Sequence, residues 1–187
     1  MTDLRKPVFD AIRAAKGSIA PHEVPYIDDL LDRLGVAKAG TTGRRAINKA
    51  GLELVKEFEG LRLKAYLCPA KVWTIGYGST GSHVRGGMVI TEAQAEELLR
   101  SDLRRFEDAV AKAAPVATDN QFSAMVCLAF NIGEGAFSGS TVLRKHNAGD
   151  HAGAAEAFKM WNKGGGQVLA GLVRRRAAEA QLYRSAA

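Results

Sequence analysis

Between residues 47 and 106, the hydrophobic pattern changes from a helical period to alternation and then back to a helical period. Apolar residues three and four apart predict a helix from about Ile47 to Phe58, and Gly60 suits the left-handed position just past its end. Residues 61–90 alternate and are rich in glycine, which predicts a small antiparallel sheet. A chain with this order of elements is expected to be an α+β protein that is predominantly helical.

A capping-box pattern marks the start of a long helix after the sheet. Thr91 is followed three residues later by Gln94, and apolar residues continue at helical spacing to Phe106. The remainder of the chain is predicted to be helical, with helices at about 119–132, 138–147, 150–161 and 167–184.

The first forty residues carry a separate pattern. Two short amphipathic helices are predicted within residues 7–36, with glycine, serine and proline in the turn between them. Residues 37–43 are small and without periodicity, which is typical of a linker. We therefore expect an N-terminal helical hairpin and linker at 1–40 and a second domain at 41–187.

The composition excludes several classes of protein. With 187 residues, of which 47% are hydrophobic and 25% charged, the chain is typical of a globular protein and not of a disordered or fibrous one. The longest apolar stretch, residues 124–130, is far shorter than the roughly 20 residues that span a bilayer. The first residues do not resemble a secretory signal, so we expect a protein that is made and stays in a cytosol.

Charge and cysteine content narrow the candidate partners. A net charge of +6 attracts polyanions such as nucleic acid, anionic lipid and anionic cell-wall polymers. The basic residues are dispersed, without a basic face interleaved with aromatic residues, so no nucleic-acid partner is expected. Cys68 and Cys127 are too few for a disulfide framework and lack zinc-ligand spacing, so both thiols are expected to be reduced.

Two further motifs favour structural interpretations. Residues 76–81 follow the G-x-G-x-x-G pattern of dinucleotide sites, but no helix start comes after them, so a glycine-rich turn is the better interpretation. His146, Asp150 and His151 resemble metal ligands, yet Asp150 stands where a helix cap is expected. We predict neither a nucleotide site nor a metal site.

Glu59 is the residue whose local chemistry points to catalysis. It is predicted at a helix C-terminus, where the negative end of the helix dipole and the apolar neighbours Phe58 and Leu61 favour a protonated carboxyl group. A carboxyl group that keeps its proton can act as a general acid. A single glutamate at a helix end is also commonly a solvated surface residue, so the surrounding sequence has to decide.

The surrounding segment, EGLRLKAYLCPAKVWTIGYG from Glu59 to Gly78, closely resembles the active-site segment of the phage-type lysozymes, glycoside hydrolase family 24. The resemblance covers about residues 46–185 and continues at 121–133, at 137–143, and at 171–176 with Glu179. It implies a lysozyme-like fold in which the long helix joins a small β lobe to a larger helical lobe, with the substrate cleft between the lobes. The N-terminal helical hairpin is expected in addition to this fold.

The resemblance also implies the catalytic residues and the reaction. In the family, the site consists of a glutamate, an aspartate or in some members a cysteine nine residues later, and a threonine six residues further on. These positions are Glu59, Cys68 and Thr74 here. The implied reaction is hydrolysis of the β-1,4 bond between N-acetylmuramic acid and N-acetylglucosamine, with water as the nucleophile and with neither a cofactor nor a metal.

The family further implies a biological role, that of an endolysin. Bacterial peptidoglycan is then the expected partner of a monomeric enzyme that stays in the host cytoplasm until a separate holin releases it to the periplasm and cell wall. Residues 1–40 would bind the cell wall or merely extend the catalytic domain. A catalytically silent wall-binding protein is the alternative, and the cysteine at the usual aspartate position is its only support.

Cys68 leaves three interpretations open. Glycoside hydrolysis needs an acid on one side of the bond and a polar group on the opposite face of the ring. Cys68 and Thr74 are expected on the two strands of a hairpin, where both could hold the attacking water. A thiol has an ordinary pKa of about 8.5, and the charge of Glu59 is expected to raise it. Cys68 could therefore position water as a neutral group, act as a thiolate base or nucleophile, or only pack.

Other positions take roles from the resemblance alone. Arg175 and Arg176 are expected to approach Glu59 from the last helix. Ser79 stands where many members have a histidine in a structural salt bridge, so a stabilising interaction is expected to be missing. The residues implied to line the saccharide cleft are Gly78, Thr80, Phe130 and Ser140.

Overall fold

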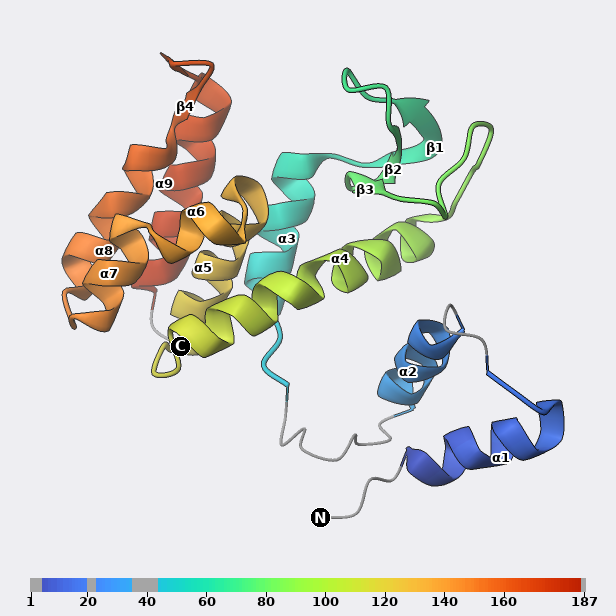
Figure 1. Cartoon of the computed structure of the whole chain (residues 1–187). Coiled ribbons are helices and arrows are strands. Elements are labelled where there is room, and N and C mark those ends of the chain that lie inside the picture. The colour runs from blue at the N-terminus through green and yellow to red at the C-terminus, as the bar shows by residue number, and fades with distance from the viewer. Residues whose placement is uncertain (1–4, 20–22, 35–43, 186–187) are drawn as a thin grey trace. The chain divides into compact units, whose positions relative to one another are not determined.

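The computed structural model describes residues 5–19, 23–34 and 44–185, and the chain divides into two compact units, Met1–Arg44 and Arg45–Ala187. In the first unit, helix α1 (Lys6–Lys16) is followed by helix α2 (Val24–Arg33), as the amphipathic pattern predicted (Figure 1). Tyr26 and Leu30 of α2 leave apolar surface exposed. The predicted linker at 37–43 lies outside the described residues.

Helix α3 (Lys49–Glu59) begins at a point that is fixed by hydrogen bonds to helix α5 (Asp119–Ile132). The Asn48 side chain caps α3 by accepting the Gly51 N–H at 2.9 Å. The Asn48 backbone N–H donates to Ser123 Oγ at 3.0 Å, and Asn48 Nδ2 donates to Asn120 Oδ1 at 2.7 Å. The N-cap residue of α3 is therefore held against the buried helix α5 through both its backbone and its side chain.

A small antiparallel sheet follows α3, as predicted. Helix α3 ends at Glu59. Gly60, the residue just past its end, has a φ of 72°, in the left-handed region where a glycine was expected. The sheet has the order β1-β2-β3, formed by β1 (Arg62–Leu67), β2 (Trp73–Gly76) and β3 (Ser79–Thr80). Thr74 in β2 lies opposite Tyr66 in β1 and Thr80 in β3.

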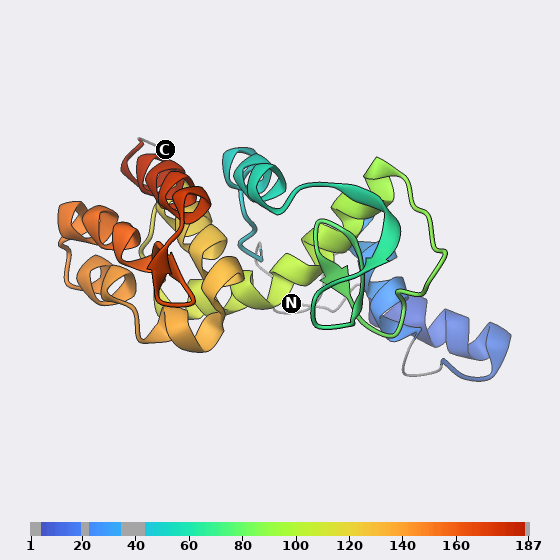
Figure 2. The same cartoon turned by 90° about the horizontal axis from the view of Figure 1, so that it is seen from above.

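Helix α4 (Glu92–Ala113) connects the sheet to the remaining helices of the second unit. It starts with the predicted capping box, in which Thr91 and Gln94 satisfy each other's backbone N–H groups. Its 22 residues correspond to a length of about 33 Å. Figure 2 shows α4 running from the sheet lobe to the helical lobe, so the expected two-lobed arrangement is confirmed.

Helix α5 forms the centre of the helical lobe. Every residue from Phe122 to Ala129 is buried, which is the pattern of a helix that is apolar on all sides because neighbours surround it. Helices α3, α4 and α9 (Ala170–Arg184) all contact α5. The α5 core thus fixes the relative positions of the helices that carry Glu59 and the two C-terminal arginines.

Two predicted helices differ from the observed ones. The helix predicted at 138–147 is α7 (Thr141–Asn147), and the short helix α6 (Glu134–Ser138) before it was not predicted. Helix α7 starts at Thr141 because the Ser140 side chain accepts the Leu143 N–H. The helix predicted at 150–161 is α8 (His151–Ala157), which continues as the 3-10 helix η1 (Phe158–Trp161).

The prediction that the remainder of the chain is helical is wrong at residues 163–168. Strands β4 (Lys163–Gly164) and β5 (Gln167–Val168) form a short hairpin there, and α9 starts only at Ala170. Gly165 and Gly166 both have positive φ angles, which glycine adopts without the steric cost of a side chain. Strand β5 therefore takes the place of the first residues of the helix predicted at 167–184.

Candidate active site

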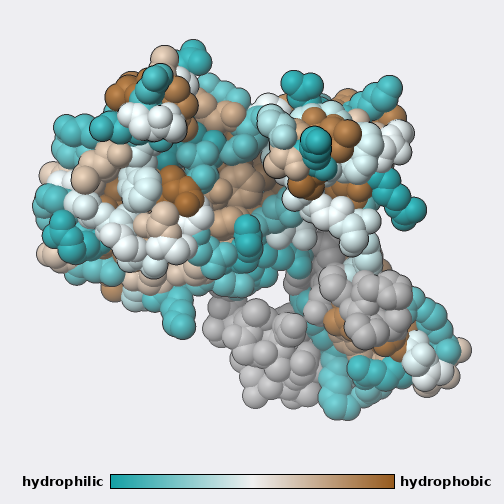
Figure 3. Space-filling model, turned by 45° about the horizontal axis from the view of Figure 1, so that its top comes forward, coloured by the Kyte–Doolittle hydropathy of each residue, from teal (hydrophilic) through white to brown (hydrophobic). Residues whose placement is uncertain are grey.

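Two of the three predicted catalytic residues lie on either side of strand β1. Glu59 is the last residue of α3, just before the strand, and Cys68 follows the strand directly. In the space-filling view, the surface is hollowed between the helical lobe and the sheet lobe (Figure 3). The connection from α3 to β1 passes from one lobe to the other, so the chain itself brings Glu59 to the junction of the lobes.

Glu59 is held by an arginine from the last helix. Arg175 Nη1 donates to Glu59 Oε1 at 2.7 Å, and the Arg175 guanidinium also lies 5.8 Å from the centre of the Phe58 ring. The Glu59 side chain is 25% exposed, whereas that of Arg175 is 4% exposed. Glu59 therefore presents an accessible carboxyl group that is oriented by a buried cation, and Arg175 is the arginine of the predicted pair that contacts it.

Arg176 points elsewhere and forms part of a buried cluster. Its Nη2 donates to Glu179 Oε1 at 2.8 Å and to Asn131 Oδ1 at 3.1 Å. Arg175 Nε donates to the same Glu179 oxygen at 3.1 Å, so Arg175 is shared between Glu59 and Glu179. The resemblance left open which of the two arginines lies nearer to Glu59, and only Arg175 contacts it, because successive helical residues point about 100° apart.

Glu179 lies at the centre of this cluster, and no role was predicted for it beyond its place in the family resemblance. Its side chain is fully buried. Burial raises the pKa of Glu179 to about 7, although Arg176 and Arg175 oppose the rise. The signal that could have found it is the spacing of three and four residues to the two arginines, which places them on one helix face.

Cys68 lies in a turn and not on a strand, which corrects the expectation. Its N–H donates to the Val72 carbonyl at 3.0 Å, and its own carbonyl accepts the Lys71 N–H at 2.8 Å. Lys71, with a φ of 58°, occupies the left-handed region that a non-glycine residue rarely adopts. Cys68 is half-buried and lies in the turn that connects β1 to β2.

The electrostatics of Cys68 also differ from the expectation. Hydrogen bonding with the backbone of Val72 lowers the pKa of the Cys68 thiol, with contributions from Ala70 and the Thr74 hydroxyl, while burial opposes them. The expectation that Glu59 raises this pKa is wrong, because the groups around the turn dominate. The turn thus favours the thiolate more than an isolated cysteine would.

Thr74 is brought next to Cys68. It is nearly buried in the middle of β2, and its hydroxyl donates to the Val72 carbonyl at 3.1 Å. The candidate site therefore combines the Glu59 carboxyl group, held by Arg175 at the end of α3, with the Cys68 thiol and the Thr74 hydroxyl at the β1–β2 turn. Such a pair can supply a proton on one side and a polar contact for water on the other.

The glycine-rich segment is a turn, as the structural interpretation held. Gly76, Gly78 and Gly81 all have positive φ angles, between β2 and the loop after β3. No atom lies within 4 Å of a Cβ built on Gly78, so its backbone conformation and not close packing requires glycine. Gly78 and Thr80 are exposed, and their place in substrate binding stays a prediction.

Phe130 and Ser140 lie in the helical lobe. Phe130 is partly buried against Phe106, with ring centres 5.3 Å apart in an edge-to-face arrangement, and its contact with substrate stays a prediction. Ser140 is 2% exposed, and its hydroxyl is used to cap α7. The Ser140 hydroxyl thus fixes the start of α7, and its place in substrate binding stays a prediction.

The interaction expected to be missing at Ser79 has a replacement. Ser79 Oγ lies 3.4 Å from His83 Nε2, and the Ser79 side chain also forms a hydrogen bond with Asp102 of α4. Burial raises the pKa of Asp102, and the Ser79 hydrogen bond and the charge of His83 oppose this. His83, four residues along the chain, thus provides the imidazole that position 79 lacks.

The histidines near α8 form a hydrogen-bonded group. Among the described residues, no three or more His, Cys, Asp or Glu side chains are arranged to hold a metal. Asp150 caps α8 by accepting the Gly153 N–H, as the structural interpretation held. His146 Nδ1 lies 2.6 Å from the Tyr183 hydroxyl, and His151 Nδ1 lies 3.3 Å from it.

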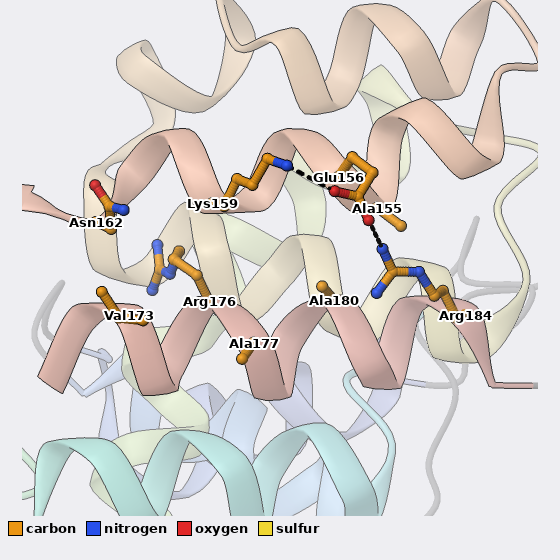
Figure 4. Close-up of a pocket in the computed structure, with 9 residues that line it drawn as sticks. All are labelled: Ala155, Glu156, Lys159, Asn162, Val173, Arg176, Ala177, Ala180 and Arg184. Atoms are coloured by element: carbon orange, nitrogen blue, oxygen red, sulfur yellow. Dashed lines mark hydrogen bonds and ion pairs between the residues drawn. The ribbon is translucent and has the colours of Figure 1, made fainter. Parts of the chain in front are cut away.

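A pocket of about 250 Å³ lies between α8–η1 and α9 (Figure 4). Arg176 enters it from α9, and Lys159, Glu156 and Arg184 form an ion-pair chain along its edge. Figure 4 shows the lining residues on α9 and on the neighbouring α8–η1 segment. It contains none of the predicted catalytic residues, so it is separate from the site around Glu59.

The fold and this site define a two-lobed α+β class of protein in which a glutamate ends the first helix of the second unit. The model of the phage lysozyme family matches residues 56–179, which include Glu59, Cys68 and Thr74. The chain belongs to the phage lysozyme family.

The relatives agree with this assignment. An endolysin of Bacillus phage PZA is 51% identical over 142 residues, covering 74% of this chain and 55% of the phage protein. An endolysin of Acyrthosiphon pisum secondary endosymbiont phage 1 is 46% identical, covering 75% of this chain and 99% of that protein. The chain thus spans about half the length of the first of these relatives and nearly all of the second.

A solved structure gives the same result for the fold. The muramidase domain of SpmX from Asticaccaulis excentricus is 44% identical, with a TM-score of 0.71, and the match covers 76% of this chain and 99% of that domain. Within the described part of this chain, none of the helices combines the length and the apolar character that crossing a membrane requires.

Proposed function

We propose that this protein is an endolysin that hydrolyses the β-1,4 bond between N-acetylmuramic acid and N-acetylglucosamine in bacterial peptidoglycan. The observation that carries the proposal is Glu59, a partly exposed carboxyl group at a helix end with a buried arginine behind it. The family match and the endolysin and muramidase names of the relatives support the same activity.

In the proposed mechanism, Glu59 is the general acid. Its proton passes to the glycosidic oxygen as the bond breaks, which leaves Glu59 ionised. Arg175, at 2.7 Å, then stabilises the carboxylate that forms. The accessible edge of Glu59 faces substrate while the arginine holds the other edge, so the carboxyl group is oriented before substrate binds.

Cys68 and Thr74 position the attacking water on the opposite face of the sugar ring. The turn that holds Cys68 supplies hydrogen bonds that favour a sulfur with partial thiolate character. A water that donates to this sulfur and to the Thr74 hydroxyl oxygen has its lone pair free to attack the anomeric carbon. Cys68 acts here as a hydrogen-bond acceptor for water, and no covalent intermediate forms on sulfur. The proton that the water loses as its bond to the anomeric carbon forms passes to the solvent, from which Glu59 is protonated again.

The wider role follows from this activity. The enzyme acts as a monomer without a cofactor or metal, starts in the host cytoplasm, and reaches the periplasm and cell wall after a separate holin opens the membrane. Residues 41–187 form the catalytic domain, and residues 1–40 are an accessory helical segment that contacts the cell wall. The exposed Tyr26 and Leu30 of α2 support a contact role for this segment.

The proposal is tested by the clearing of peptidoglycan sacculi from Gram-negative cells. Glu59→Gln should abolish clearing, and Glu57→Gln is the matched control, because Glu57 is an exposed carboxylate two residues away on the same helix. Products are reduced with borohydride and analysed by mass spectrometry. A reduced muramic acid end supports a muramidase, and a reduced glucosamine end or an anhydro sugar contradicts it.

Variants at Cys68 separate the remaining alternatives. Cys68→Ser should retain at least a tenth of the activity, because a hydroxyl can also accept a hydrogen bond from water. Cys68→Ala should lose activity with folding unchanged. If the wild type binds sacculi without clearing them and Cys68→Asp clears them, the protein is a silent wall-binding relative and the proposal is wrong.

A further inference from the structure

The excess positive charge of this protein is concentrated in the sheet lobe, residues 60–91. This segment contains β1, β2 and β3 and includes four basic residues but no aspartate or glutamate, so it carries +4 of the chain's net charge of +6. Among the described residues, none of the four forms an ion pair, and all are exposed: Arg62, Lys64, Lys71 and Arg85. The acidic residues that border the segment are Glu92 and Glu59, of which Glu59 is paired with Arg175. The sheet lobe is therefore a cationic surface that its own residues do not neutralise.

Exposed apolar side chains lie among these cations. Leu67 and Trp73 are paired across β1 and β2, and Val72 directly precedes Trp73. The exposed fractions of Leu67, Val72 and Trp73 are 53%, 44% and 37%. A Cβ built on Gly86 would lie 2.6 Å from Trp73 Cζ2, so the loop that carries Arg85 lies directly against the indole.

These residues belong to one patch of the sheet lobe. We call it the Trp73 surface, and it consists of Leu67, Lys71, Val72, Trp73 and Arg85. In the space-filling view, apolar residues lie between protruding hydrophilic ones on this lobe (Figure 3). Single exposed apolar residues are common on protein surfaces, whereas a group of them between unpaired cations is typical of an interaction site.

The Trp73 surface is separate from the side chain that the candidate active site uses on the same strand. Trp73 and Thr74 are successive residues of β2, and successive side chains of a strand point to opposite faces of a sheet. Thr74 is 4% exposed, and its hydroxyl faces the β1–β2 turn. A partner can therefore cover the indole without covering the threonine.

We propose that the Trp73 surface binds the surface of an anionic phospholipid bilayer. Lysine and arginine are attracted to negatively charged headgroups, and tryptophan prefers the boundary between headgroups and acyl chains. Exposed leucine and valine gain free energy by leaving water for that boundary. An anionic glycan or a nucleic acid would attract the cations equally, but it offers no apolar layer for the aliphatic side chains. The combination of charges and aliphatic groups therefore favours a bilayer.

The size of the charge effect follows from the number of cations. Each lysine or arginine close to an anionic bilayer strengthens binding about fivefold. Removing the charges of Lys71 and Arg85 should therefore weaken binding about 25-fold at low salt. The difference should shrink when the salt concentration rises from about 50 to about 300 mM, because salt screens the attraction.

The first test measures sedimentation of the full chain with vesicles of phosphatidylcholine that contain about 30% phosphatidylglycerol. The double variant Lys71→Gln with Arg85→Gln should bind these vesicles about 25-fold more weakly than the wild type. Its matched control is Lys112→Gln with Lys163→Gln, which removes two exposed cations from the helical lobe and should bind like the wild type. Vesicles of phosphatidylcholine alone should bind all of these proteins weakly.

The second test locates the contact by tryptophan fluorescence. The chain has two tryptophans, so Trp161→Phe leaves only Trp73 and Trp73→Phe leaves only Trp161. Lipids with brominated acyl chains quench a tryptophan that reaches into the bilayer. We expect quenching in Trp161→Phe and none in Trp73→Phe. Leu67→Ser should also weaken binding several-fold, whereas Val116→Ser should not, because Val116 is 80% exposed but lies in the helical lobe.

Three results would overturn the inference. They are equal vesicle binding by the wild type and the folded Lys71→Gln, Arg85→Gln variant, a Trp73 that brominated lipid does not quench, and a loss of binding in this variant that affects only sacculi or a DNA duplex. If the double variant does not fold, as judged by circular dichroism, the Trp73 quenching decides alone. The vesicles contain no peptidoglycan, so this test is independent of the proposed hydrolysis.

Discussion

The contact between α3 and α5 leads to a stability prediction at Gly51. A Cβ built on Gly51 would lie 2.8 Å from Ser123 Cβ and 2.7 Å from Ile47 Cγ1, and both distances are shorter than real Cβ contacts. Ser123 Cβ belongs to the buried helix α5 and cannot rotate away. Gly51→Ala therefore forces α3 and α5 apart at the point where the Asn48 cap is attached.

The magnitude follows from two opposing effects. Alanine in place of glycine inside a helix stabilises it by about 1 kcal/mol. Overpacking in a close-packed interface costs typically about 1–3 kcal/mol, and the loss of the cap hydrogen bonds to α5 adds to this cost. We expect a net destabilisation of about 1–2 kcal/mol, which is a fall in Tm of about 2–8 °C for a domain of this size.

The assay is thermal unfolding followed by circular dichroism, together with urea unfolding at 25 °C. Gly171→Ala is the matched control, because Gly171 lies in the first turn of α9 with no atom within 4 Å of its built Cβ. This variant should unfold at the same temperature as the wild type or slightly higher. A Tm of Gly51→Ala equal to or above that of the wild type would refute the argument that α3 and α5 are in closest contact there.

Two further predictions concern the helical lobe. Burial lowers the pKa of His146 below its ordinary value of about 6.5, so the folded protein binds fewer protons there than the unfolded chain, and stability should fall as the pH falls through 6.5. His146→Gln should flatten this dependence of Tm on pH between pH 7.5 and 5. A slope equal to that of the wild type would contradict the prediction. Asp150→Ala should lower the stability measured by urea unfolding because it removes the α8 cap, whereas Asp150→Asn keeps a capping oxygen and should lose less. Equal losses would assign the effect to the ion pair with Lys145 instead.

Local signals explain which elements could be predicted. The bounds of α5 follow from a Thr118 cap and an uninterrupted apolar run, and the end of α3 follows from Gly60. These features depend only on neighbours within one turn of the chain. The β4–β5 hairpin was missed because its strands are only two residues long, too short to show any period.

The parts of the site that were missed depend on contacts between distant segments. Periodicity places Arg175 and Arg176 on the same helix, but only the packing of α9 against α3 decides that Arg175 reaches Glu59. His83 stands in for a histidine at position 79 because both positions approach Asp102 of α4. Glu179 was part of the matched pattern, but no role was predicted for it, because a fully buried glutamate is exceptional and sequence alone favours a surface position for it.

The anchoring of Asn48 has a consequence for how this domain can be combined with other segments. Because its hydrogen bonds to Asn120 and Ser123 set the start of α3, the position of Glu59 eleven residues later does not depend on what precedes Arg45. Insertions, deletions or exchanged modules ahead of that residue leave the register of the helix unchanged. The domain is therefore suited to recombination, in evolution as in engineered fusions, with its reactive carboxyl group kept in place by its own core.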